Sequence, residues 1–136
     1  MIKDDCIFCK LANGIIPTNT IYEDEDFNVF LDASPATKGH CLIVPKNHYR
    51  NLIDIDDELA AKIMPTAKKI SKVLKDKLGW QGLNLVQNNE ELAGQTVFHF
   101  HLHIIPRYVG DGQIIGWNPG TPDAGELEKV KSDIIA

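Results

Sequence analysis

Three histidines alternate with large apolar residues in the stretch His-Phe-His-Leu-His-Ile-Ile-Pro, which covers residues 99–106. Strict alternation with a period of two is typical of a half-buried β-strand, and the proline should end it. Residues two apart on a strand point to the same face. The imidazoles of His99, His101 and His103 should therefore form a row on one face. The residues between them should pack into a core on the other face, namely Phe100, Leu102 and Ile104.

The histidine row is long enough for two separate roles. At about 3.3 Å per residue it spans roughly 13 Å, which is too far for all three imidazoles to bind one ion. A strand has no structural need for imidazole, so three in register favour a functional role over three solvated side chains. Neutral imidazole can attack phosphorus and form a covalent intermediate. With an ordinary pKa near 6.5, about three quarters of it is neutral at pH 7.

The other candidate ligands are two further histidines and a Cys-x-x-Cys pair. All five histidines fall in two places, because His40 and His48 flank a second apolar stretch. Antiparallel neighbours would bring both groups together. One Cys-x-x-Cys pair, Cys6 and Cys9, is a weak signal by itself, and no βαβ pattern follows that would favour a redox motif. With two histidines it would complete a closed, structural zinc site. The alternative is two thiols without a function near the chain end.

A zinc site of this kind would reinforce the fold. Structural zinc can contribute on the order of 10 kcal/mol, but a chain of this length also has an apolar core. The middle histidine would remain free for chemistry. The polar run Gly94-Gln95-Thr96 just before the row could present backbone N–H groups and side-chain donors to a phosphate.

The remaining chain predicts the elements that position these side chains. The order is strands, one long helix, then strands, with no βαβ alternation, which favours an α+β fold: an antiparallel sheet with helices on one face. Proline at position 65 should kink the long helix. The expected strands are Thr20–Glu23 and Phe27–Leu31, which should form a hairpin, and His40–Val44 and Leu83–Gln87, besides the histidine strand. The expected helices are a short one ending at Gly14, a long one from Asp54 or Asp56 to Gly79, and a last one from about Asp123.

Composition and charge exclude several classes of protein. A chain of 136 residues suits a single domain. The formal charge of -5 argues against nucleic-acid binding and against anionic membrane surfaces. No signal peptide or membrane-spanning run is visible, so we expect a cytoplasmic protein. Three cysteines without a secretion signal argue against a disulfide framework.

The histidine stretch is similar to the His-φ-His-φ-His-φ-φ signature of the histidine triad (HIT) superfamily. Separated motifs resemble its nucleotide-binding branch, in particular zinc-bearing bacterial members. They are Cys6–Cys9, Ile16-Pro17, Tyr22–Asp24, Gly39–His48, Asn88 and Gly94–Val97. The resemblance covers about residues 6–107 of one domain, 1–136, and the tail 108–136 matches less well.

The resemblance implies a homodimer of α+β subunits, each with a five-stranded antiparallel sheet, one long helix and short terminal helices. It implies cleavage at the α-phosphate of purine nucleotide conjugates, either phosphoramidates or dinucleoside polyphosphates. His101 matches the nucleophile that becomes a nucleotidyl-histidine, and His103 and His40 match the supporting histidines. Cys6, Cys9, His48 and His99 match the ligands of a structural zinc.

The same resemblance implies a nucleotide pocket. Asp32 matches the carboxylate that binds ribose hydroxyls. The residues that match the apolar base pocket are Phe8, Leu11, Phe30 and Ala33. Those that match contacts to the phosphate and the leaving group are Asn88, Gln95 and Thr96. Trp117 in the tail could reach the site of the partner subunit.

Two alternatives remain open on the sequence. A non-catalytic nucleotide sensor or partner-binding module would keep the same pocket. A zinc hydrolase could instead bind its metal through the His-x-His-x-His row, although such a site needs an open coordination position and no cysteine ligands. The presence of Cys6 and Cys9 argues against that second alternative.

Overall fold

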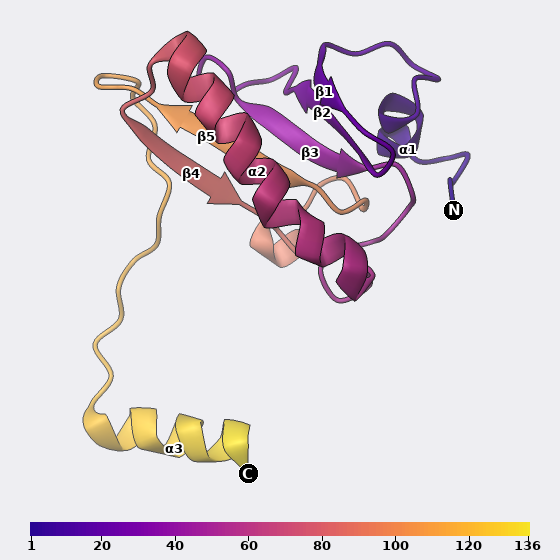
Figure 1. Cartoon of the computed structure of the whole chain (residues 1–136). Helices are drawn as coiled ribbons and strands as arrows, with labels where there is room; N and C mark the ends of the chain where they lie inside the picture. The colour runs from indigo at the N-terminus through magenta and orange to yellow at the C-terminus, as the bar shows by residue number, and fades with distance from the viewer.

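The computed structural model describes residues 1–136 and contains one five-stranded antiparallel sheet. The strand order is β1-β2-β3-β5-β4, so β5 lies between β3 and β4 (Figure 1). The strands are β1 (Thr20–Glu23), β2 (Phe27–Leu31), β3 (Cys41–Pro45), β4 (Gly82–Val86) and β5 (Leu102–Arg107). β1 and β2 form the expected hairpin. The α+β antiparallel fold predicted from the sequence is confirmed.

Three α-helices and one 3-10 turn complete the chain. They are α1 (Ile7–Ala12), α2 (Asp57–Leu78), α3 (Ala124–Ile135) and the 3-10 turn η1 (Glu91–Ala93). α2 begins after Asp56, continues through Pro65 and ends at Gly79, whose φ of 67° suits a glycine C-cap. None of the helices has the length and apolar character needed to cross a membrane.

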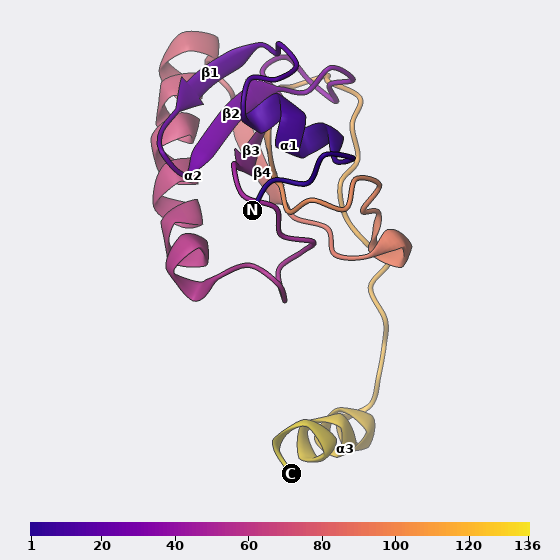
Figure 2. The same cartoon turned by 90° about the vertical axis from the view of Figure 1, so that its right-hand side faces the viewer.

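α1 and α2 lie on opposite faces of the sheet (Figures 1 and 2), so the expectation of helices on one face was wrong. β2 and β3 are buried on both sides, which explains their nearly continuous apolar sequences. Val29 and Ile43 belong to the larger core, which also contains Ile63 and Ile70 of α2. Phe30 and Leu42 belong to a smaller core that contains Ala12 of α1. Alternate residues of β2 and β3 therefore pack toward α2 on one face and α1 on the other.

The apolar half of the histidine stretch is anchored as predicted. Phe100, Leu102 and Ile104 all lie in the larger core, with exposures of 3%, 6% and 0%. Burial of each such side chain contributes roughly 1.5–3 kcal/mol. This core fixes the position of the histidines between these residues.

The strand itself differs from the prediction, since β5 starts at Leu102 and includes Pro106. His99 and His101 lie in the irregular segment before it. There the chain leaves β3, whose pairing with β5 covers Leu102 to Ile104, and Phe100 N–H instead donates to Tyr49 O at 2.6 Å. Histidines and apolar residues still alternate before β5 begins, because the alternation reflects burial of every second side chain and does not require pairing with β3.

The tail leaves the body of the molecule. Every residue from Gly112 onward is exposed, and α3 lies apart from the sheet (Figure 1). α3 begins after Asp123, near the predicted start, and the Asp123 carboxylate accepts from Glu126 N–H at 2.8 Å. The packed part of the chain therefore ends near Gln113, whose side chain still bonds Ala36 O.

Candidate active site and metal centre

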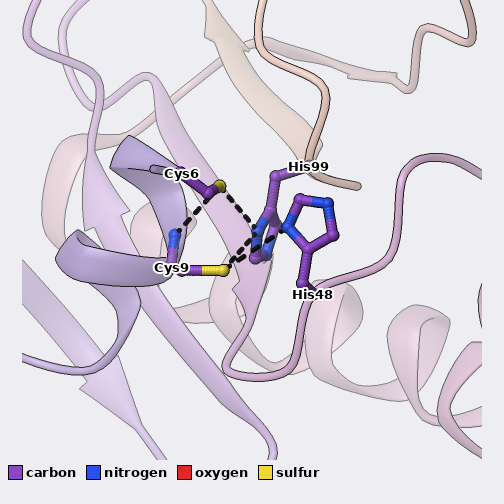
Figure 3. Close-up of side chains that lie close together, drawn as sticks. All are labelled: Cys6, Cys9, His48 and His99. Carbon is purple, nitrogen blue, oxygen red and sulfur yellow. Dashed lines mark hydrogen bonds between the residues drawn. The ribbon is translucent and has the colours of Figure 1, made fainter. Parts of the chain in front are cut away.

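Two cysteines at the start of α1 and two distant histidines converge on one point (Figure 3). Cys6 is the N-cap of α1, and Cys9 N–H donates to its sulfur at 3.4 Å. The spacing of three places both thiols on one side of a helical turn. His48 follows β3 and His99 precedes β5, and the four ligand atoms lie within 4.8 Å of one another. The structure thus brings together the four residues predicted as metal ligands.

The orientation of His99 suits a metal ligand. Its Nε2 lies 2.8 Å from Pro45 O, and a carbonyl oxygen only accepts, so Nε2 holds the proton. The lone pair of Nδ1 then points at the sulfurs of Cys6 and Cys9, at 3.3 and 3.4 Å. Tetrahedral zinc with N and S ligands would separate such atoms by about 3.5 Å. A backbone carbonyl that orients a ligating histidine is the usual outer-shell arrangement of metal sites.

The electrostatics of this cluster favour a bound cation. Burial lowers the pKa of His99 to about 4, so its imidazole is neutral, which is the ligating form. Burial raises the pKa of the Cys9 thiol, and the neighbouring Cys6 adds to the effect. A divalent cation would stabilise the thiolate. The donor set therefore fits a closed four-ligand zinc centre.

His101 lies beside this cluster with its reactive nitrogen free. Its Nδ1 is 2.7 Å from His99 O, so Nδ1–H donates to that carbonyl and Nε2 keeps its lone pair. The ring meets the edge of Phe8, with 4.9 Å between centroids. Burial lowers the pKa of His101 below its ordinary value, against the opposing effects of the His99 carbonyl and Asp32. The side chain is thus a neutral imidazole whose Nε2 lone pair is free.

In a second pair of histidines, His40 and His103, hydrogen bonds fix which ring nitrogen holds the proton. Ala36 N–H donates to His40 Nδ1 at 2.9 Å, so the proton of His40 is on Nε2. That Nε2–H donates to His103 Nδ1 at 2.9 Å, which leaves the His103 proton on Nε2. Burial lowers the pKa of both rings, that of His103 to about 4. The positive charges that His101 and His40 would bear when protonated lower the pKa of His103 further. The Asp32 carboxylate, 3.5 Å from His40 Nε2, raises the pKa of His40 and so opposes the effect of burial there.

The group Asp32, His40 and His103 resembles a three-ligand metal site but is unsuited to be one. The three ligand atoms lie within 4.8 Å of one another. A metal on His40 Nε2 would force the proton onto Nδ1, where it would oppose the Ala36 N–H. The histidine row is therefore divided: His99 faces the cysteines, and His103 faces His40. This division argues against a metal bound by the row itself.

A cavity of about 590 Å³ opens beside His101 and His103. It is large enough for a nucleotide-sized ligand. Of the predicted pocket residues it is lined by Phe8, Leu11, Phe30, Asp32, Ala33, Asn88 and Thr96. It is also lined by Gly94, from the polar run expected to face a phosphate, and by residues that we did not select, namely Pro17, Thr18, Asn19, Leu31, Leu42 and Val97. For Pro17, the only signal in the sequence was the Ile16-Pro17 motif.

Gln95 occupies a different position from the predicted one. Its side chain is 1% exposed and does not line the cavity. The amide oxygen accepts from Glu90 N–H at 2.7 Å, and the amide nitrogen donates to Arg50 O at 2.7 Å. Gln95 therefore holds the loop before the histidines in place and has no free group for a phosphate.

The chain matches a known protein family. Residues 13–110 match the model of the HIT domain. The chain belongs to the HIT family. Its relatives include the adenosine 5′-monophosphoramidase of Saccharomyces cerevisiae, which is 39% identical over 96% of this chain and 81% of the relative.

Solved structures of HIT proteins agree with this assignment. A HIT-family protein from Bacillus subtilis has a TM-score of 0.89 at 42% identity, over 96% of this chain and 95% of that chain. A zinc-bound histidine triad protein from Mycobacterium smegmatis has a TM-score of 0.77 at 35% identity, over 95% of this chain and 97% of that one. HIT membership, predicted from the histidine stretch, is confirmed.

Proposed function

We propose that this HIT protein cleaves purine nucleoside 5′-phosphoramidates at the α-phosphate through a covalent nucleotidyl-histidine on His101. Two observations support the proposal: Nε2 of His101 is unprotonated, and His101 lines a nucleotide-sized cavity. The relative named as an adenosine 5′-monophosphoramidase supports the substrate class. Dinucleoside polyphosphates, which present the same α-phosphorus, are the second substrate class to assay.

The reaction divides into two displacements. In the first, the Nε2 lone pair of His101 attacks the α-phosphorus, the P–N bond breaks, and the leaving amine takes a proton from solvent. In the second, a water oxygen attacks the same phosphorus, the Nε2–P bond breaks, and the proton of that water returns to solvent. The products are the free amine and the nucleoside monophosphate, and His101 regains its lone pair.

The histidines around His101 would stabilise the charge that develops on phosphorus. His103 lines the cavity, and its Nε2–H can donate to a non-bridging phosphate oxygen. His40 keeps that proton in place by donating to the other nitrogen of His103. The His99 carbonyl accepts from Nδ1–H of His101 and so steadies the positive charge of the phosphorylated imidazole.

The rest of the cavity provides binding groups for a nucleotide. Phe8 and Phe30 meet edge to face with 5.9 Å between centroids, and with Leu11 and Ala33 they offer apolar surface to a purine. Asp32 accepts from Ser34 N–H through Oδ1 and can accept ribose hydroxyls through Oδ2. Asn88 and Thr96 line the cavity and offer donors to the phosphate and the leaving group.

We also propose that Cys6, Cys9, His48 and His99 bind one structural zinc ion. The closed donor set supports zinc, as does the zinc-bound relative. When bound, zinc would tie α1 to the segment before β5. The position of α1 matters because Phe8 and Leu11 of this helix line the cavity.

A homodimer is the arrangement that best covers the outer edge of the sheet. β4 is an edge strand and presents unpaired backbone groups to a neighbour. The hollow of about 800 Å³ between α2 and β4 is lined by apolar side chains such as Met64, Leu83 and Leu85, and also by Lys68, Lys72 and Lys75. Pairing of β4 with its copy would bury both features. A second copy of this chain is therefore the proposed protein partner. We propose no binding of nucleic acid or of a membrane.

Intact-mass spectrometry of the full chain tests the covalent step. The protein is mixed with adenosine 5′-phosphoramidate and quenched within the first turnovers. We expect an added adenylyl group on the wild type and none on His101→Ala, which should lose turnover by at least about a thousandfold while it still binds AMP. His103→Asn, the matched control, should still form the adduct, more slowly. Full turnover by His101→Ala would overturn the proposal, and AMP binding by an inactive wild type would indicate a nucleotide sensor.

A further inference from the structure

The loop that orients His40 is held by the end of β5 and the segment that follows it. Ala36 N–H donates to His40 Nδ1 at 2.9 Å and so decides which nitrogen of His40 holds the proton. The carbonyl of the same residue accepts from the side-chain Nε2 of Gln113, also at 2.9 Å. The main chain of Ala36 is therefore bound on both sides, by the histidine that it orients and by a residue far along the chain.

The two residues after Ala36 are held in the same way. The Thr37 hydroxyl donates to Pro106 O. The Tyr108 hydroxyl donates to Lys38 O at 2.7 Å. Three consecutive residues of the loop are thus bonded to the segment from Pro106 to Gln113. This segment therefore holds the loop that carries the Ala36 N–H.

A half-buried carboxylate organises that segment. Both oxygens of Asp111 accept from Arg107, from Nε at 2.8 Å and from Nη2 at 3.0 Å. The same carboxylate accepts the backbone N–H groups of Tyr108 and Gln113, each at 3.0 Å. Arg107 also donates to Gln113 O at 2.6 Å. Although the Gln113 side chain is exposed, its backbone is fixed at both N–H and carbonyl, and the Asp111 side chain is only 10% exposed.

We propose that Asp111 and Gln113 are positioning residues that, through Ala36, hold His40 in the tautomer with its proton on Nε2. The effect on turnover rests on the proposed function, but the effect on the tautomer does not. If the proton of His40 moved to Nδ1, two lone pairs would meet between His40 and His103 at 2.9 Å. His103 would then move its own proton to Nδ1 and present a lone pair to the phosphate. A displaced Ala36 N–H would in this way remove a hydrogen-bond donor from the place where the phosphate reacts.

Imidazole nitrogen shifts measured by long-range ¹H–¹⁵N NMR on the full, zinc-supplemented chain test the proposal directly. The variants are Gln113→Ala, which removes the donor to Ala36, and Asp111→Asn, which weakens the grip on Arg107. The matched control is Asp133→Asn, which removes an exposed carboxylate that pairs with Lys129 on α3. In the wild type we expect Nδ1 of His40 and of His103 to be unprotonated. In both test variants we expect a mixture of tautomers at His40, and in the control the wild-type pattern.

The kinetic readout separates positioning from a general loss of structure. With adenosine 5′-phosphoramidate, kcat should fall by between about tenfold and a hundredfold in the test variants, with KM little changed. Gln113 is exposed, so Gln113→Ala should fold even if Asp111→Asn is unstable.

The two proposals fail in different ways. A wild-type tautomer at His40 in a folded Gln113→Ala protein would overturn the positioning role, whatever the activity. A wild type without turnover, combined with the expected change of tautomer, would overturn the proposed function and leave the positioning role intact.

Discussion

Acidification should destabilise this protein through His103, whose pKa burial lowers to about 4 from an ordinary value of 6.5. The unfolded chain then binds a proton at a higher pH than the folded chain does. Stability is therefore complete above the unfolded pKa, falls as the pH drops below 6.5, and levels off below 4. His101, His40 and Asp32 face this ring, and only Asp32 opposes the shift.

The size of the effect follows from the two pKa values. Between about pH 7.5 and about pH 5, a pKa of 4 in place of 6.5 removes about 2 kcal/mol of stability. This loss is a sizeable share of the 5–15 kcal/mol by which typical domains are stable. His99 and His40 also have lowered pKa values, so the wild type should lose more than this in total.

A comparison of two proteins isolates the share of His103. Urea unfolding followed by circular dichroism gives the free energy of unfolding at both pH values for the wild type and for His103→Asn. An asparagine does not titrate, and its side-chain oxygen can still accept from His40 Nε2–H. Protein and zinc concentrations are kept fixed, since association and metal binding both change apparent stability.

The expected result is a pH dependence that is about 2 kcal/mol weaker in His103→Asn. The other histidines titrate in both proteins, so their contributions largely cancel in the difference. Parallel curves for the two proteins would refute the reasoning, because His103 would then have the same pKa folded and unfolded.

Three further predictions concern the metal, the sheet edge and one glycine. The double variant Cys6→Ser, Cys9→Ser should lose its zinc in elemental analysis, and each kcal/mol of lost binding should lower the unfolding midpoint by roughly 3–5 °C; retained zinc would point to a site on the histidine row. The wild type should be a dimer in light scattering at micromolar concentration, and Leu85→Lys at the edge strand should shift it toward monomer; a monomeric wild type would contradict the dimer. Gly39→Ala should cost more than the roughly 1–2 kcal/mol of its positive φ, since the new Cβ would lie 2.5 Å from Leu78 Cδ1. Gly14→Ala, also at positive φ but in open space, is the matched control, and an equal loss in urea unfolding would refute the steric part.

The two histidine clusters show why an outer partner decides the role of an imidazole. His99 Nε2 meets a carbonyl acceptor, so the lone pair of Nδ1 is available to a metal. His40 Nδ1 meets a backbone N–H donor, so its Nε2 holds a proton and donates. The side chains are chemically identical. The backbone groups that face them make one a candidate ligand and the other a donor.

The sequence by itself determined features that depend on neighbours along the chain. Alternation predicted that Phe100, Leu102 and Ile104 face the core, and all three do. The glycine stop of α2 and the β1–β2 hairpin were likewise read correctly. The ends of β5 were not, because pairing with β3 ends at Leu102 while the alternation continues to His99. Periodicity reports which side of the chain is buried and does not report what lies opposite.

Only the tertiary structure decided which groups face each functional side chain. The partners of His99, Gln95 and Ala36 are Pro45, Arg50 and Gln113, which lie 54, 45 and 77 positions away. No local pattern marks such pairs, because they arise when separate elements pack against one another. The same contacts divide the histidine row into a side that faces the cysteines and a side that faces His40 and the cavity. They also commit the Gln95 amide to a loop and link the segment after β5 to His40. The residue types therefore defined the possible chemistry, and the folded contacts assigned each residue its part in it.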